Sequence, residues 1–283
     1  MMLQRARQWL LDRKDDNLLT ERAARFAAAD LLVVSYTKSG RTWLRVLLSN
    51  MLARCYGLDD KELLNGDNLH RMDARAPKVF FAADTRLPYP EQGPARVTVQ
   101  PHQRVLFLVR DPRDVTVSFH FHVRYRANQR ELRRKRISPA VRELDLDRFV
   151  VDPSFGIMRV IGYLNRWVEQ RAALPHAEVL RYEDLRADTA KELARVARLI
   201  GLDVDPPLID AVVDFADFES LKKKERDGYF NSDRLGLRKA DNEASGKVRQ
   251  GEVGGYRARL QPATVAELDR LVAAHLHPAY GYR

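Results

Sequence analysis

The sequence has 283 residues and a formal net charge of +10; 45% of its residues are hydrophobic and 31% are charged. This composition is typical of a globular protein, and the length allows one large α/β domain or two small ones. The single cysteine, Cys55, excludes an internal disulfide. No apolar run reaches the roughly 18 residues of a membrane-spanning helix, and the N-terminus lacks a signal-peptide segment. We therefore expect a cytoplasmic protein whose positive charge favours phosphorylated cofactors, acidic saccharides, anionic lipids or nucleic acid as partners.

Residues 1–30 have the apolar spacing of one or two amphipathic helices packed on the edge of the domain; a membrane-surface anchor is the weaker alternative. The apolar run Leu31–Tyr36 then predicts a buried parallel strand. Apolar residues recur at helical spacing from Arg41 to about Tyr56, which predicts a helix. The short segment Thr37–Gly40 forms the turn between this strand and this helix.

The strand, turn and helix together indicate an anion-binding site. The free N–H groups at the start of a helix and the positive end of its dipole suit a phosphate. Lys38 adds a positive charge, and Ser39 and Thr42 add hydroxyl donors. Many such turns bind nothing, so an ordinary turn stays an alternative. The turn is not a Walker A loop, because G-x-x-x-x-G-K-[ST] is absent and the lysine precedes Gly40, which disfavours a magnesium-nucleotide hydrolase.

The rest of the chain alternates between predicted strands and helices. Strands are expected at 78–81, 104–110 and 178–182, and helices at 112–125, 155–173, 189–200, 206–215 and 262–275. The 57–75 segment has loop or short-helix character, 88–94 is an irregular connection, and 222–255 is a polar, glycine-rich stretch. This alternation predicts a parallel sheet covered by helices on both faces. We found no internal repeat and no linker, so a single domain over residues 1–283 is the better interpretation.

A second informative stretch is Val109-Arg-Asp-Pro-Arg-Asp-Val-Thr-Val-Ser118. Arg110 ends a predicted strand, where open α/β sheets bind their ligands, and its planar guanidinium matches phosphate oxygens. Ser118 lies two turns into the following helix and offers a hydroxyl. The alternative for Arg110 is a structural ion pair with Asp111 or Asp114.

Taken together, four stretches resemble the cytosolic-type sulfotransferases. Ser35-Tyr-Thr-Lys-Ser-Gly-Arg-Thr-Trp43 is similar to that family's 5′-phosphosulfate loop, and the Arg110 stretch is similar to its 3′-phosphate motif. Arg181-Tyr-Glu-Asp-Leu185 and Arg249-Gln-Gly-Glu-Val-Gly-Gly-Tyr256 match two further motifs in the same order. The resemblance implies a P-loop-like nucleotide-binding α/β fold. It also implies transfer of a sulfuryl group from 3′-phosphoadenosine 5′-phosphosulfate (PAPS) to an acceptor hydroxyl or amine, leaving adenosine 3′,5′-bisphosphate (PAP).

The resemblance also implies roles for individual residues. The 5′-phosphosulfate would be held by Lys38, Ser39, Gly40, Arg41 and Thr42, with Lys38 stabilising the leaving phosphate oxygen. The 3′-phosphate would be bound by Arg110, Ser118, Arg249, Gln250 and Gly251. The adenine would be contacted by Trp43, Tyr182 and, as a weaker match, Phe218. Gln250 replaces the family's usual lysine, Thr37 a proline and Arg41 a threonine. No metal is needed, and no metal-ligand cluster is evident among the seven histidines.

The important departure concerns the catalytic base. The family places a histidine in a K-T-H-L-P-like segment, whereas Pro77–Pro88 contains none. Ala83 or Arg86 occupies the expected position, depending on the alignment, and neither can accept a proton. Three interpretations are open: an inactivated variant with Ala83 in place of the base, Asp84 acting instead, or nucleotide binding without efficient turnover. His120 and His122 are remoter candidates that line the acceptor side or pack.

The segment Arg124–Arg136 carries seven cations and one acid. It is either a solvated helix face or a flank of the acceptor cleft, where it would favour an acidic saccharide, a lipid headgroup or a membrane surface. Nucleic acid is disfavoured because no aromatic residues interleave with these charges in the manner of a single-strand-binding surface. The alternative functions are a nucleoside-triphosphate-dependent P-loop kinase or hydrolase and a non-catalytic nucleotide- or polyanion-binding protein.

Overall fold

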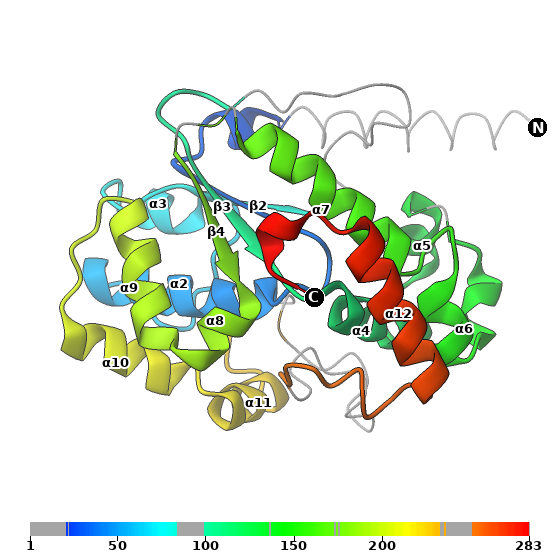
Figure 1. The fold of residues 1–283 in the computed structure, drawn as a ribbon. Helices are drawn as coiled ribbons and strands as arrows, with labels where there is room; N and C mark the ends of the chain where they lie inside the picture. The colour runs from blue at the N-terminus through cyan, green and yellow to red at the C-terminus, as the bar shows by residue number, and fades with distance from the viewer. Residues whose placement is uncertain are drawn as a thin grey trace, which may run out of the picture.

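The computed structural model describes residues 21, 23–83, 99–135, 137–172, 174, 176–232, 235 and 251–282. Its centre is a parallel sheet of four strands in the order β2-β1-β3-β4 (Figure 1). The strands are β1 (Leu31–Ser35), β2 (Val79–Ala83), β3 (Arg104–Val109) and β4 (Ala177–Arg181). β1 pairs with both β2 and β3, so that Ser35 lies opposite Ala83 on one side and Leu108 on the other. The predicted parallel α/β sheet is confirmed.

Helices cover both faces of the sheet, as Figure 1 shows. The helices are α2 (Arg41–Tyr56), α3 (Asn68–Met72), α4 (Pro112–Tyr125), α5 (Gln129–Arg134), α6 (Leu146–Val151), α7 (Ile157–Arg171), α8 (Tyr182–Ala187), α9 (Thr189–Leu199), α10 (Pro206–Phe215), α11 (Phe218–Arg226) and α12 (Pro262–His275), with 3₁₀ turns η3 (Pro139–Glu143) and η5 (Pro278–Tyr280). Successive residues of β1 point to opposite faces. Leu31 and Val33 therefore pack with α2, α9 and α10, whereas Leu32 and Val34 pack with α4, α6, α7 and α12.

Local sequence signals explain where the elements that carry the site begin. Asp111 caps α4, because its side chain accepts a hydrogen bond from the backbone N–H of Arg113, and Pro112 occupies the first turn. Gly201 follows α9 with a φ of 77°, as expected of a glycine that ends a helix. These predicted boundaries are confirmed.

The structure also corrects the sequence analysis. Tyr182, predicted as the last residue of a strand, instead begins α8, and α11 extends to Arg226, into the stretch described from sequence as polar and glycine-rich. The short helices α5 and α6 were not predicted, because six residues are too few to show a helical period. Of the helices predicted over residues 1–30, residues 1–20 and 22 lie outside the described residues, whereas residues 23–27 are helical. In the part of the chain that the structure covers, no helix combines the length and apolarity needed to cross a bilayer.

Candidate functional site

A cavity of about 300 Å³ opens where β1 and β3 end and α2 and α4 begin. It lies within the size range of small-molecule sites and at the carboxyl edge of a parallel sheet, where such sites are expected. Its lining combines the turn after β1, the start of α2, α4, Tyr182 and the segment after Gly251. The lining residues are Thr37, Lys38, Gly40, Arg41, Thr42, Trp43, Arg110, Asp114, Val117, Ser118, His122, Arg126, Glu131, Tyr182, Arg186, Phe218, Leu221, Gly251, Glu252, Gly255 and Arg259.

The turn after β1 has an unusual backbone. Lys38 has a φ of 71°, the only positive φ of a non-glycine residue among the described residues, and Gly40 has a φ of 93°. A left-handed lysine costs on the order of 1–3 kcal/mol, so the surrounding fold must hold it in place. No side chain caps α2, whose N-cap is Gly40. The N–H groups at the start of α2 are therefore left to serve a ligand, which fits an anion.

Gly40 is required by a close approach as well as by its φ. A Cβ at this position would lie 2.4 Å from Cδ2 of Tyr182, far inside van der Waals contact. The ring of Tyr182 thus rests directly on the turn, and its hydroxyl donates a hydrogen bond to the carbonyl oxygen of Gly251 at 3.0 Å. This one side chain joins the turn after β1 to residues 251–259, called the C-terminal segment below.

Replacing Gly40 by alanine is expected to reduce the affinity for PAP, the nucleotide that the family resemblance implies, more than 10-fold, because the new methyl group must displace Tyr182 and strain the turn. Isothermal titration calorimetry measures this change. Gly57→Ala is the matched control: Gly57 also has a positive φ, 65°, but a Cβ there meets nothing within 4 Å. The control should lose stability and keep wild-type PAP affinity. Equal PAP affinity in the two variants would show that the Gly40–Tyr182 contact does not shape the site.

Arg110, directly after β3, reaches the same cavity. Its Nη2 donates a hydrogen bond to the carbonyl oxygen of Glu252 at 2.7 Å and lies 3.6 Å from Oδ2 of Asp114. The guanidinium carbon lies 4.3 Å from the centre of the Tyr182 ring. The buried Nε of Arg110 has no hydrogen-bond partner within the described ranges. A buried, unsatisfied donor on a cation is the expected feature of a site that binds an anion.

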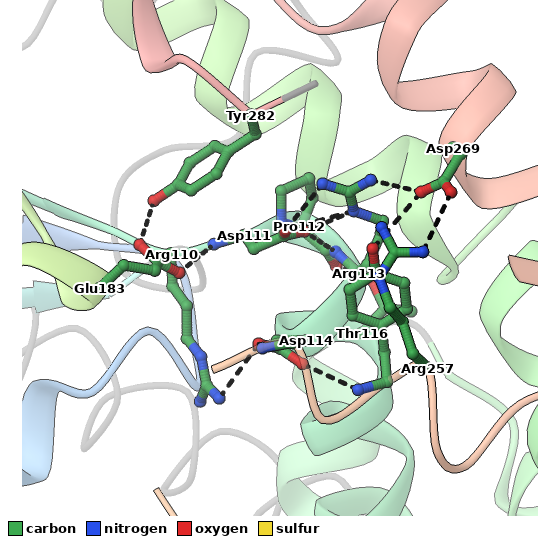
Figure 2. Close-up of polar contacts among 12 residues, drawn as sticks. Arg110, Asp111, Pro112, Arg113, Asp114, Thr116, Glu183, Arg257, Asp269 and Tyr282 are labelled. Carbon is green, nitrogen blue, oxygen red and sulfur yellow. Dashed lines mark hydrogen bonds and ion pairs between the residues drawn. The ribbon is translucent and has the colours of Figure 1, made fainter. Parts of the chain in front are cut away.

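Asp114 connects α4 to the C-terminal segment (Figure 2). Its carboxylate accepts hydrogen bonds from the backbone N–H groups of Gly254 at 2.8 Å and Tyr256 at 3.1 Å. Burial is the main cause that raises the pKa of Asp114, and the charge of Arg110 opposes it. Of the two alternatives for Arg110, the ion pair is present, since Asp114 pairs with it; Arg110 also lines the cavity, and its role in binding phosphate stays a prediction.

Replacing Asp114 by asparagine is expected to weaken PAP binding several-fold and to lower the thermal unfolding temperature. An amide cannot accept both backbone hydrogen bonds, and a lost hydrogen bond to a charged group costs about 1.5–3 kcal/mol. Asp184→Asn is the control, because Asp184 is half-exposed and its ion pair with Arg181 is long, at 3.8 Å. Calorimetric titration and thermal denaturation of both variants test this. Unchanged PAP affinity in Asp114→Asn would mean that the anchored segment does not contribute to the site.

Glu183, which follows Tyr182 in the third motif, has a structural role at the start of α4. As Figure 2 shows, one oxygen accepts the backbone N–H of Asp111 at 3.0 Å, and the other accepts the hydroxyl of Tyr282 at 2.6 Å. Arg113 pairs with Asp111 at 2.8 Å and with Asp269 of α12. These contacts fix the start of α4, and hence Arg110, against the C-terminal part of the chain.

Aromatic side chains line the side of the cavity next to α2 and α11. The ring centres of Trp43 and Tyr182 are 5.9 Å apart in an edge-to-face arrangement. The indole N–H of Trp43 donates to the carbonyl oxygen of Ala216 at 3.0 Å, which fixes its orientation. Phe218 lies beside Gly251, within 3.4 Å of where a Cβ there would stand. Such surfaces suit a planar base.

The predicted site residues divide into three groups. Those that line the one cavity are Lys38, Gly40, Arg41, Thr42, Trp43, Arg110, Ser118, Tyr182, Phe218 and Gly251. Ser39 is fully buried and its side chain does not line the cavity. Asp84, Arg249 and Gln250 lie outside the described residues, and of Ala83 only the backbone at the end of β2 is described.

Other lining residues were considered from sequence only as part of a longer segment, or not at all. Arg126 and Arg259 add positive charge, and Glu131 adds a carboxylate. Arg126 belongs to the basic segment Arg124–Arg136 and is only 7% exposed, as is expected of a cleft flank, whereas Arg124 and Arg133 are exposed, as on a solvated helix face. No local pattern marks Arg259 or distinguishes Arg126 and Glu131 from the rest of the basic segment, because only the packing of α4, α5 and the C-terminal segment brings the three together. No three His, Cys, Asp or Glu side chains group as metal ligands in the described part of the chain.

The fold is a parallel α/β sheet, and the cavity at its carboxyl edge has the donors, cations and aromatic surfaces that suit a nucleotide-like anion. Comparison with known families matches residues 28–279 to the family described as "Sulfotransferase domain". The match spans most of the chain, so the protein belongs to this sulfotransferase family, and the resemblance inferred from the motifs is confirmed. It is accordingly an enzyme of sulfuryl transfer.

Characterised relatives are distant in sequence. The chain is 25% identical to cytosolic sulfotransferase 15 of Arabidopsis thaliana, over 86% of this chain and 70% of the relative. It is 24% identical to the amine sulfotransferase of Oryctolagus cuniculus, over 86% and 79%. Among solved structures, mouse sulfotransferase SULT7A1 complexed with PAP superposes with a TM-score of 0.60 at 18% identity, covering 92% of this chain and 89% of that one. Retinol dehydratase in a complex with retinol and PAP gives 0.57 at 17% identity, over 87% and 80%.

Proposed function

We propose that the cavity binds PAPS and that the chain, acting as one domain in the cytoplasm, transfers its sulfuryl group to the hydroxyl or amine of a small molecule. The observation that carries this proposal is that Lys38 and Arg110, on neighbouring strand ends, line one cavity. One doubly phosphorylated ligand can therefore contact both cations. The PAP complexes of the two structural relatives support the choice of nucleotide.

The residues present fit this ligand. The uncapped N–H groups of α2, with Lys38 and Thr42, would bind the 5′-phosphosulfate, while Arg110, through its unsatisfied Nε, and Ser118 would bind the 3′-phosphate. Trp43 and Phe218 would hold the adenine. When bound, PAPS supplies an activated sulfuryl group whose transfer needs mainly positioning and charge stabilisation. Lys38 would neutralise the negative charge that grows on the phosphate oxygen as it leaves.

The acceptor is proposed by class only. Six of the lining residues are cations, namely Lys38, Arg41, Arg110, Arg126, Arg186 and Arg259, against the three acids Asp114, Glu131 and Glu252. The lining therefore has three more positive than negative side chains, which suits a nucleotide that carries several negative charges. A saccharide or lipid acceptor remains within this proposal, as does contact of the basic segment with an anionic surface. The amine sulfotransferase and the retinol complex among the relatives support small acceptors. The relatives include a cytosolic sulfotransferase, which supports the proposed cytoplasmic location.

Incubating the protein with labelled PAPS and a panel of phenols, alcohols, sugars and amines tests the function. We expect PAP to appear together with a labelled product, without added metal. The competing nucleoside-triphosphate function, which the family match does not favour, would instead give magnesium-dependent hydrolysis of ATP or GTP. A protein that binds polyanions in a salt-sensitive manner and ignores PAPS would contradict the proposal.

A further inference from the structure

The site needs a group that removes the acceptor's proton. The family resemblance places a basic histidine at Ala83, which ends β2, or at Arg86, depending on the alignment, and neither residue can take that role. The cavity does contain another imidazole. His122 lines it from α4, four residues after Ser118 and thus on the same face of the helix.

His122 has the partner that a catalytic histidine requires. Its Nε2 lies 2.8 Å from Oε1 of Glu131, a carboxylate of α5 that lines the same cavity. An ionised carboxylate only accepts hydrogen bonds, so Nε2 carries the proton and Nδ1 carries the lone pair. Glu131 is itself held by its place in the first turn of α5, where Asn128 caps the helix by accepting its backbone N–H at 2.9 Å.

The other nearby histidine lacks these features. His120 is 4% exposed, does not line the cavity, and contacts the carbonyl oxygen of Leu144 at 3.1 Å through Nε2. Its ring packs 5.0 Å from that of Phe149. His120 is thus part of the hydrophobic core, whereas the side chain of His122 keeps 16% of its surface exposed and accessible from the cavity.

Resting on the proposed function, we propose that the His122–Glu131 pair is the general base of sulfuryl transfer in this protein. Nδ1 of His122 takes the proton of the acceptor hydroxyl while the acceptor oxygen bonds to sulfur. The bond between sulfur and the 5′-phosphate oxygen breaks, and its electron pair stays on that oxygen, beside Lys38. The resulting imidazolium is stabilised by Glu131 and returns its proton to solvent.

The charges around His122 suit a base at neutral pH. Burial is the largest cause that lowers its pKa below the usual value, and the positive charges of Lys38 and Lys135 act in the same direction. The hydrogen bond and charge of Glu131 oppose them. Arg126, which also lines the cavity, adds further positive charge on this side. The imidazole is therefore neutral, and able to accept a proton, at pH 7.

The test compares His122→Gln with His102→Gln, whose histidine is exposed and remote from the cavity. PAP binding is measured by calorimetry, and transfer is measured as PAP release from PAPS with water as the acceptor, so that no unidentified acceptor is needed. We expect His122→Gln to bind PAP like the wild type and to release PAP about 10²–10⁴-fold more slowly. His102→Gln should match the wild type in both.

Nuclear magnetic resonance provides a second readout that does not depend on turnover. The imidazole signals of His122, assigned by their loss in His122→Gln, should titrate below pH 6.5 and show the tautomer protonated at Nε2. Glu131→Gln removes the group that raises the pKa, so the titration should move to lower pH. In the wild type, the rate should fall on acidification through the same pKa, because only the neutral imidazole accepts a proton.

Each outcome decides between the two proposals. A wild-type chain that does not bind PAP refutes the proposed function, and the base falls with it. A wild type that binds PAP but never releases it from PAPS, either with water or with any acceptor of the panel, refutes the transfer step of the proposed function. A His122→Gln variant with the wild-type rate overturns only the base. Loss of rate in Asp84→Asn with His122→Gln unaffected would assign the role to Asp84.

Discussion

Replacing Lys38 by methionine is expected to lower kcat for PAP release from PAPS by about 10²–10³-fold, the usual loss when one preorganised charge stabiliser is removed. Lys38 stands at the tip of the turn after β1, lines the cavity, and is held at a φ of 71° that the fold must stabilise. Methionine keeps the length and the Cβ of lysine, so the backbone strain is unchanged and only the charge is removed.

The control for this prediction is Lys191→Met, which removes an exposed charge from α9. Steady-state kinetics with PAPS should show a loss of kcat in Lys38→Met and none in Lys191→Met. Circular dichroism and thermal unfolding establish that both variants are folded. If Lys38→Met keeps the wild-type kcat, Lys38 does not stabilise the leaving oxygen and the assignment of the turn is wrong.

Replacing Arg110 by alanine should weaken PAP binding by about 100-fold, since charge-assisted hydrogen bonds to a phosphate contribute roughly 1.5–3 kcal/mol each. Arg110 is largely buried, with 12% of its side chain exposed, and its Nε has no hydrogen-bond acceptor among the described residues. Alanine also leaves Asp114 as a buried carboxylate without its nearest cation, which adds to the loss through the C-terminal segment.

A ligand without the 3′-phosphate separates these two effects. Adenosine 5′-monophosphate should bind the wild type weakly, and Arg110→Ala should change that affinity little. Arg104→Ala is the matched control, because Arg104 begins the same strand at the opposite edge of the sheet. An equal loss for both nucleotides would mean that Arg110 acts only through the fold and does not touch the 3′-phosphate.

The sequence alone predicted the sheet well for a physical reason. Strands of a parallel sheet are covered on both faces, so they are continuous apolar runs such as Leu31–Tyr36 and Arg104–Arg110, which are easily found. Helices with a long apolar face, such as those from Arg41 and Pro262, were found as well. The helices α5 and α6 were missed because each has six residues and is defined by a cap, not by a period.

The lining residues that belong to local motifs, which we propose bind the nucleotide, were also predictable, but other parts of the cavity were not. Lys38 and Arg110 follow strands that turn out to be neighbours, and each sits in a local motif. His122 and Glu131 are nine residues apart on two different helices, and no local sequence pattern predicts their hydrogen bond. The roles of Asp114 and Glu183, which tie α4 to Gly254 and Tyr282, likewise depend on segments more than 90 residues apart in sequence.

Comparing the affinities of the wild-type protein for PAP, adenosine 5′-monophosphate and adenosine 3′-monophosphate by calorimetric titration tests the central claim most directly. If Lys38 and Arg110 hold the two ends of one carrier, PAP should bind one to one, without metal, and at least 10-fold more tightly than either monophosphate. A protein that binds PAP no better than the monophosphates would contradict the account.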